Sequence, residues 1–292
     1  MYPILFQFNS FNIYAYGFFI ALGFVMAVVL AALKIRKSTH STPRSEARGM
    51  LRVDTERRFL PRFKNRGLAP SNVSNIRISF EEIVELFFYT VFSAFLGSRI
   101  LFVLINFDVY RQHPLRIFKI WEGGLVFYGG LILAVIVAFW YLRRRRLPIW
   151  KLADLISPLI ALGLSFGRIG CFLAGCCYGN ETSLPWAVVF KNPDSLARLN
   201  VSLHPTQLYD AANGLAIFFF LNWIEKRKTF DGQIFWLFLF LYSITRFFIE
   251  FLRGDPRGFL FGGLLSTSQG VGILLAIASI FMLFYMKKKR RR

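Results

Sequence analysis

The chain has 292 residues, of which 55% are hydrophobic and 35 are phenylalanine, yet its formal net charge is +20. A soluble domain of this size would not combine so much apolar content with so few acidic residues, so the composition indicates a polytopic membrane protein. Strong positive charge is also typical of nucleic-acid-binding proteins, but the basic residues here lie between and after apolar runs, which argues against that class.

Seven apolar runs follow one another along the chain, each close to the roughly 20 residues that a helix needs to cross a bilayer core. The third and fifth runs are the shortest. The first run has no basic segment before it and is too long for a cleaved signal peptide, so we expect it to be retained as a span. We therefore predict an all-α polytopic membrane protein with about seven transmembrane helices, near Ile13–Leu33, Ile83–Ile105, Gly124–Leu142, Leu152–Leu173, Leu208–Ile224, Gly232–Phe251 and Leu264–Met286.

The basic residues predict the orientation of these spans. The segments on one side carry 26 of the 36 Lys and Arg residues, and the loops on the other side carry only seven. Because basic loops stay on the cytoplasmic side, this bias predicts an N-terminus outside and a C-terminus in the cytoplasm. The cytoplasmic segments are then Lys34–Arg77, Arg143–Lys151, Lys226–Lys228 and Lys287–Arg292.

One long polar insertion interrupts the apolar pattern. It is a basic loop over residues 36–78, rich in Arg, Ser, Pro and Asn, and a basic tail over 287–292 resembles it in charge. Polybasic segments beside a span are attracted to anionic lipid, so we expect both to lie against the cytoplasmic surface. The whole of 1–292 is predicted to be a single integral-membrane domain.

Three arginines, Arg99, Arg168 and Arg246, fall inside the apolar runs, and Glu250 follows Arg246 by four residues. An ionisable group inside a span costs at least about 2.5–3.5 kcal/mol, so it normally faces a partner or an aqueous cavity. Arg246 and Glu250 lie on one helix face and can pair. Since one acid cannot neutralise three arginines, the surplus charge favours binding of an anion such as phosphate, which the guanidinium fork fits. A purely structural ion pair is the alternative.

Arg168 lies in the stretch "SFGRIGCFLAGCCYGN", which also holds the chain's three cysteines. Its small residues suit both close helix packing and a backbone that bends around a ligand. The spacing C-x4-C-C differs from that of structural zinc sites, which pair C-x2–4-C with further ligands. We therefore expect neither a metal nor another cofactor, and we interpret Cys171, Cys176 and Cys177 as small buried hydrophobic residues.

Two further segments carry polar residues at the ends of spans. "LHPTQLYD" holds His204 where the fifth run begins, a position typical of a turn or cap. "WEGGLVFYGG" holds Tyr128 where the third run begins, and its paired glycines indicate an irregular or closely packed helix entry.

Five segments in order resemble the prolipoprotein diacylglyceryl transferase family. "IYAYGFFIALGF" is similar to the family's first span, and "WEGGLVFYGG" to its W-D-G-G-x-x-x-H-G-G. "GRIGCFLAGCCYG" resembles the signature G-R-x-G-N-F-x-N-G-E-x-x-G. "HPTQLYD" is similar to H-P-S-Q-L-Y-E, and "YSITRFFIEFLR" to Y-x-x-x-R-F-x-x-E-F-F-R. The resemblance covers nearly the whole chain.

The resemblance implies a transferase of lipoprotein biosynthesis in the bacterial cytoplasmic (inner) membrane. Such an enzyme moves an sn-1,2-diacylglyceryl group from phosphatidylglycerol to the lipobox cysteine of a prolipoprotein, forming a thioether and releasing glycerol phosphate. Its partners would be phosphatidylglycerol and prolipoprotein signal peptides, without nucleic acid. Two alternatives stay open: an inactive relative that binds lipid or signal peptides, and a lipid or anion transporter.

The resemblance also implies roles for individual residues. Arg168, Arg246 and Tyr128 would be catalytic. The headgroup site would be formed by Arg168, Arg246, Tyr16, Tyr242, Glu250 and Gly179, with Arg99, Cys171 and His204 as weaker candidates.

Three of the positions at which this chain departs from the family pattern bear on the chemistry of the site. Tyr128 stands where many members have histidine, Cys171 where the signature commonly has asparagine, and Cys176 where it has glutamate. These departures leave open how the thiol is deprotonated. Tyr128 or His204 would act as the general base, or the arginines would lower the pKa of the substrate thiol so that no strong base is required.

Overall fold

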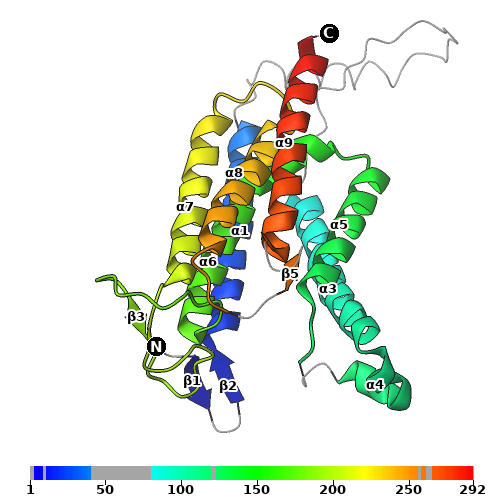
Figure 1. Cartoon of the computed structure of the whole chain (residues 1–292). Coiled ribbons are helices and arrows are strands. Elements are labelled where there is room, and N and C mark those ends of the chain that lie inside the picture. The colour runs from blue at the N-terminus through cyan, green and yellow to red at the C-terminus, as the bar shows by residue number, and fades with distance from the viewer. Residues whose placement is uncertain are drawn as a thin grey trace, which may run out of the picture. The chain divides into compact units, whose positions relative to one another are not determined.

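The computed structural model describes residues 3–8, 11–40, 80–119, 123–255, 258–260 and 265–291. Its helices are α1 (Ala15–His40), α3 (Phe80–Ile105), α4 (Phe107–Gln112), η1 (Pro114–Phe118), α5 (Phe127–Arg144), α6 (Ile149–Ala174), α7 (Thr206–Glu225), α8 (Gln233–Glu250) and α9 (Thr267–Arg291) (Figure 1). Three antiparallel hairpins pair β1 (Ile4–Phe8) with β2 (Phe11–Tyr14), β3 (Val188–Val189) with β4 (Ser202–Leu203), and β5 (Phe259–Leu260) with β6 (Leu265–Ser266). The predicted basic loop 36–78 lies outside the described residues, apart from the end of α1.

Six of the described helices are long and apolar enough to cross a membrane. They contain the candidate spans Ala15–Lys34, Glu81–Ile105, Phe127–Arg144, Ile149–Ala174, Gln233–Glu250 and Thr267–Arg290. These agree with six of the seven predicted runs to within a few residues, which confirms the all-α polytopic membrane class. The number seven and the orientation remain predictions.

The remaining predicted run corresponds to α7, which is 20 residues long but is not one of the six candidate spans. Its first turns are polar, since Thr206, Gln207 and Asp210 all lie there, and all three side chains are buried within the protein. Three of the polar residues that lower the apolar character of this helix are therefore buried in the protein interior.

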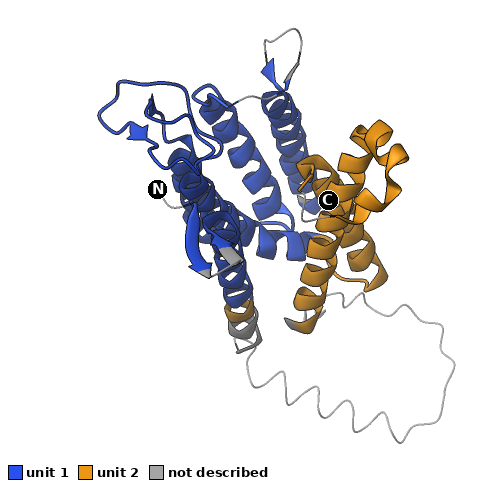
Figure 2. Ribbon diagram, turned by 90° about the horizontal axis from the view of Figure 1, so that it is seen from below, with its two compact units in different colours: residues 1–31, 150–292 blue, residues 32–149 orange. Residues whose placement is uncertain are grey.

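The chain divides into two compact units, residues 1–31 with 150–292 (unit 1) and residues 32–149 (unit 2) (Figure 2). In unit 2, α3 packs against α5 through glycines. A Cβ atom on Gly97 would collide with the backbone of Gly129, and one on Gly130 would collide with the carbonyl of Ala94. Small residues therefore let these two helices approach to backbone contact, as in other membrane helix pairs. The single integral-membrane domain over 1–292 stays a prediction.

In unit 1, helices α6, α7 and α8 lie side by side around a common apolar core (Figure 1). A Cβ on Gly214 of α7 would come within 2.9 Å of the Ala161 carbonyl of α6. One turn further along α6, Ser165 Oγ donates to the Ala211 carbonyl of α7 at 2.8 Å. The two helices are thus in close contact beside the core residues Ala161, Ile217, Leu221, Ile234 and Phe238.

The start of α8 is held by a buried carboxylate on α6. Asp154 accepts hydrogen bonds from the backbone N–H groups of Gly232 at 2.7 Å and Phe235 at 2.9 Å, and its Oδ2 pairs with Lys228 Nζ at 2.9 Å. Burial lowers the pKa of Lys228, but Asp231 and Asp154 outweigh that effect and raise it above the ordinary 10.5. The ion pair therefore contributes stability below that pH and is lost only as pH rises beyond it.

Replacing this carboxylate is expected to destabilise unit 1. Asp154→Asn should lower the free energy of unfolding by about 3 kcal/mol, because breaking a buried pair leaves Lys228 without its buried partner. Thermal unfolding of the purified protein in detergent measures the effect. The matched control is Asp231→Asn, whose carboxylate is 45% exposed and pairs with the same lysine, so its loss should cost less than about 1 kcal/mol. Equal losses in the two variants would contradict the anchoring role.

Candidate active site

Arg168 lies near the end of α6 and faces the first turns of α7. Its Nε is 3.2 Å from Oδ2 of Asp210, and its side chain is only 19% exposed. Among the described residues, neither Nη group of Arg168 has a hydrogen-bond partner, so the carboxylate anchors the guanidinium at one nitrogen. The remaining Nη donors are free to bind a ligand.

Arg246 reaches the same carboxylate from α8. Its Nη1 donates to Asp210 Oδ2 at 2.8 Å, and its Nη2 lies 2.8 Å from Glu250 Oε2 one turn along the helix. The predicted pairing of Arg246 with Glu250 is therefore present. Because Asp210 contacts both guanidinium groups, we refer to Arg168, Asp210, Arg246 and Glu250 together as the arginine cluster.

Asp210 is the residue of this cluster that the sequence analysis missed. It is buried, and its Oδ1 has no hydrogen-bond partner among the described residues. The sequence did contain a signal for Asp210, since it is an acid inside a predicted span and ends the "LHPTQLYD" segment. With Asp210 included, two acids face Arg168 and Arg246, so these two arginines carry no surplus positive charge. The feature that favours an anion is the set of unused Nη donors on Arg168.

Glu250 is fixed by the residues that lead into α9. Its Oε1 accepts hydrogen bonds from Ser266 Oγ at 2.8 Å and from Ser268 Oγ at 2.9 Å. Its side chain is 2% exposed, and Arg253 approaches the other oxygen at 3.9 Å. Glu250 is thus a buried hydrogen-bonded anchor that orients Arg246.

Arg99, predicted as a weaker candidate for the headgroup site, lies in unit 2. All five of its N–H donors are used by backbone carbonyls of the segment after α4. Nε donates to Ile117, Nη1 to Gly123 and Gly124, and Nη2 to Arg116 and Lys119, at 2.6–3.2 Å. A guanidinium has five such donors. Arg99 therefore holds a loop of unit 2 in place and has no donor left for phosphate.

The predicted tyrosines differ in how the structure places them. Tyr16 begins α1 and packs against α6 at Gly170, where a Cβ would come within 3.1 Å of the Tyr16 Cα atom. Tyr242 lies one turn before Arg246 on α8 and stacks on Phe238. Both therefore lie beside the arginine cluster.

Tyr128 belongs to unit 2, at the start of α5, and is 41% exposed. Its catalytic role stays a prediction. Trp121 and Glu122, in the same segment, lie outside the described residues.

The loop after α6 carries the cysteines and is fastened to α7 and to the end of α8. Thr206 Oγ1 donates to the Cys177 carbonyl at 2.9 Å, and Gln207 Nε2 donates to the Cys176 carbonyl at 2.8 Å. Gly179 forms a bridge with Arg253 and donates its N–H to the His204 carbonyl. A Cβ on Gly179 would collide with His204, so close backbone approach requires this glycine. The "HPTQ" segment thus positions the cysteine loop.

His204 lies at this junction, before the first residue of α7, as its predicted turn position implies. Its Nδ1 is 3.4 Å from Tyr209 Oη, and that hydroxyl accepts a hydrogen bond from Trp186 Nε1 at 2.7 Å. The ring is therefore engaged with Tyr209, and its use as a base stays untested.

Comparisons with known proteins show which family this chain resembles. A family model described as prolipoprotein diacylglyceryl transferase matches residues 65–285. The chain is 34% identical over 282 residues to the phosphatidylglycerol–prolipoprotein diacylglyceryl transferase of Clostridium tetani, covering 97% of this chain and 96% of that one. It is 34% identical over 281 residues to a second transferase of that name from Clostridium perfringens, with coverage of 96% and 94%. For the enzyme of Vibrio cholerae, identity is 36% over 212 residues, with coverage of 72% and 76%.

The role of Arg99 can be tested by Arg99→Lys. A lysine has three donors and no fork, so at least two of the five carbonyls lose their partner. We expect hydrogen–deuterium exchange of residues 116–119 and 123–124 to accelerate by at least about tenfold, the effect of 1.4 kcal/mol. Unchanged exchange in this segment would contradict the structural role. Lys119→Met serves as the control, because it removes a cation of the same segment while keeping the backbone carbonyl that Arg99 binds.

Proposed function

The chain belongs to the prolipoprotein diacylglyceryl transferase family, and we propose that its arginine cluster binds the phosphate of phosphatidylglycerol during the transfer. The chain is a phosphatidylglycerol–prolipoprotein diacylglyceryl transferase. The observation that carries the site assignment is Arg168, which is anchored to Asp210 through Nε and presents unused Nη donors.

The reaction breaks a carbon–oxygen bond at the phosphate ester, so negative charge grows on the leaving glycerol phosphate. Preorganised donors that are already oriented stabilise such charge at low reorganisation cost. Asp210 and Glu250 hold Arg246 from two sides, and Asp210 holds Arg168 at Nε. Two guanidinium groups fixed in this way are suited to grip the phosphate as the bond breaks, with the fork of Arg168 making the direct contact.

Other residues of unit 1 would complete the headgroup site. Tyr16 and Tyr242 supply hydroxyl groups near Arg168, and Gly179 allows the backbone to pass close by. Asp210 Oδ1, buried without a partner among the described residues, offers an acceptor for a hydroxyl group of the glycerol head. This acceptor is a reason to expect a polyhydroxyl headgroup and not a bare phosphate.

The second substrate is a prolipoprotein whose lipobox cysteine supplies the attacking sulfur. A thiol with a pKa near 8.5 is only slightly ionised at neutral pH, so the site must favour the thiolate. We expect this multi-pass membrane protein to act in the bacterial cytoplasmic membrane. With the predicted orientation the arginine cluster would lie toward the outer face, where a signal peptide would present its cysteine after translocation.

The activity can be measured directly with purified protein. Phosphatidylglycerol and a lipobox peptide with a single cysteine should yield a peptide whose mass has increased by one diacylglyceryl group. A peptide with serine in place of that cysteine should remain unmodified. Wild-type protein that binds both substrates but yields no adduct would refute the transferase function.

The phosphate-binding role predicts that lysine substitutions in the arginine cluster lower the activity, whereas the same substitution outside it does not. Arg168→Lys should lower kcat/KM for phosphatidylglycerol by roughly 100-fold, because a point charge cannot reproduce the guanidinium fork. Arg246→Lys should cost a similar factor, since it also releases Asp210 and Glu250. Arg198→Lys is the matched control: this arginine forms an exposed ion pair with Glu181 in the same unit, and its activity should stay within about twofold. Near-normal turnover of Arg168→Lys would contradict direct phosphate binding.

A further inference from the structure

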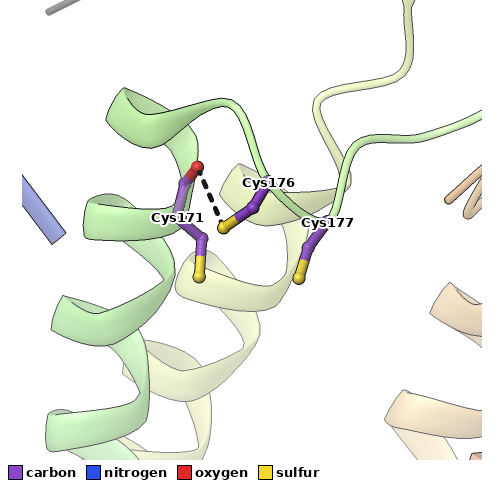
Figure 3. A group of neighbouring side chains, drawn as sticks. All are labelled: Cys171, Cys176 and Cys177. Carbon is purple, nitrogen blue, oxygen red and sulfur yellow. Dashed lines mark hydrogen bonds between the residues drawn. The ribbon is translucent and has the colours of Figure 1, made fainter. Parts of the chain in front are cut away.

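All three cysteines of the chain converge at one point in unit 1. Their Sγ atoms lie within 4.8 Å of one another, on the same side of the loop that follows α6 (Figure 3). Cys171 is buried, while Cys176 and Cys177 are half-buried. We refer to these three residues as the cysteine cluster.

The three Sγ atoms come together because two residues of the loop have a left-handed backbone conformation, and not because of the spacing of the cysteines in the sequence. Gly175 has φ of 78° and ends α6, and Cys177 has φ of 60° although it is not a glycine. Neighbouring side chains in extended backbone point to opposite sides, but this turn brings Cys176 and Cys177 to the same side. A non-glycine residue at positive φ costs about 1–3 kcal/mol and persists where the surroundings impose it. Here the bonds from Thr206 and Gln207 to the two cysteine carbonyls impose it.

The geometry matches what zinc requires. Catalytic zinc sites use three protein ligands and keep a fourth position open, and Zn–S bonds of about 2.3 Å place tetrahedral sulfur ligands about 3.8 Å apart. Sulfur atoms that already lie within 4.8 Å reach that spacing by small side-chain rotations. The spacing C-x4-C-C differs from that of structural zinc sites, but the turn at Cys177 brings the three Sγ atoms together despite that spacing.

The charges around such a site are also suitable. Three thiolates and a divalent ion carry one net negative charge, and the positively charged Arg168 lies about one turn of α6 before Cys171.

We propose that the cysteine cluster binds a zinc ion whose fourth position takes the lipobox cysteine of the prolipoprotein as a thiolate. This inference rests on the proposed function, because it names how the second substrate is activated. When the peptide thiol binds the ion, its proton is released to solvent. The sulfur then forms a bond to the terminal glyceryl carbon of phosphatidylglycerol, the carbon–oxygen bond breaks, and glycerol phosphate leaves with the electron pair.

This arrangement would deprotonate the substrate thiol without a general base, a role for which the chain's side chains offer no clear candidate. A thiol coordinated to a metal is deprotonated outright, so no strong general base is needed. Cys171 and Cys176 stand where the family signature commonly has asparagine and glutamate, and Tyr128 stands in place of histidine. The three departures then share one explanation: a site that activates the thiol by coordination. The arginine cluster, one turn of α6 away from Cys171, stays available for phosphate.

Zinc analysis and X-ray absorption test the site without relying on activity. Protein purified under reducing conditions with zinc should carry about one zinc per chain, bound to three sulfur atoms at about 2.3 Å. Adding the lipobox peptide should raise the sulfur count from three to four, whereas the serine peptide should leave it at three. Because the chain has only three cysteines, every protein sulfur ligand of this kind comes from the cluster. Substoichiometric zinc, or zinc without sulfur ligands, would overturn the proposal.

Variants and chelation then connect the metal with catalysis. Cys171→Ser, Cys176→Ser and Cys177→Ser should each lose zinc at least tenfold more readily and lose most of the transfer activity. Ser202→Ala, at the exposed residue of strand β4, should keep both. Chelation should abolish transfer, and zinc should restore it. Because the X-ray absorption result on wild-type protein needs no variant, a substitution that fails to fold does not decide the outcome.

The two hypotheses fail in distinguishable ways. Transfer that continues in the chelated protein and in all three serine variants would overturn the zinc proposal and leave the transferase function intact. A site with three sulfur ligands in a protein that makes no diacylglyceryl adduct, even when loaded with zinc, would refute the transferase function while confirming the metal site.

Discussion

The active-site half of the molecule depends on one carboxylate, that of Asp210. Its Oδ2 is 3.2 Å from Arg168 on α6 and 2.8 Å from Arg246 on α8, so a single oxygen on α7 ties three helices together. Ionised groups inside a membrane protein are stable only when they are paired or hydrated. Each member of the cluster therefore makes the burial of the others possible. The same constraint explains why α7 begins with polar residues that are buried within the protein.

The arginines of the spans illustrate that intramembrane position alone does not define a binding site. Arg99 and Arg168 have the same side chain in similar apolar surroundings, yet Arg99 uses all five donors on backbone carbonyls, whereas Arg168 uses only Nε. The difference is one of partners. A guanidinium whose donors are all satisfied stabilises a loop, while one anchored at a single nitrogen retains the fork that matches phosphate.

The cysteine loop joins the two chemical requirements of the reaction in one region of unit 1. It starts within two turns of Arg168, is bound to α7 through Thr206 and Gln207, and reaches the end of α8 through Gly179. The elements that fix the arginine cluster therefore also fix the cysteines. A leaving phosphate and an attacking thiolate must be held in a defined mutual geometry, and shared supports of this kind provide it.

The sequence by itself was enough for the membrane class, for six of the long apolar helices, for the family and for the pairing of Arg246 with Glu250, because hydropathy, helical spacing and ordered motifs are local properties of the chain. It was not enough for Asp210, the role of Arg99 or the cysteine cluster. Each of these depends on contacts between segments far apart in the chain or on backbone dihedrals that no residue type imposes. Asp210 meets Arg168 across 42 positions of sequence, and Cys177 turns toward its neighbours at a positive φ that sequence does not predict for cysteine. Only tertiary structure could decide them, because which donor meets which acceptor is settled when the helices pack.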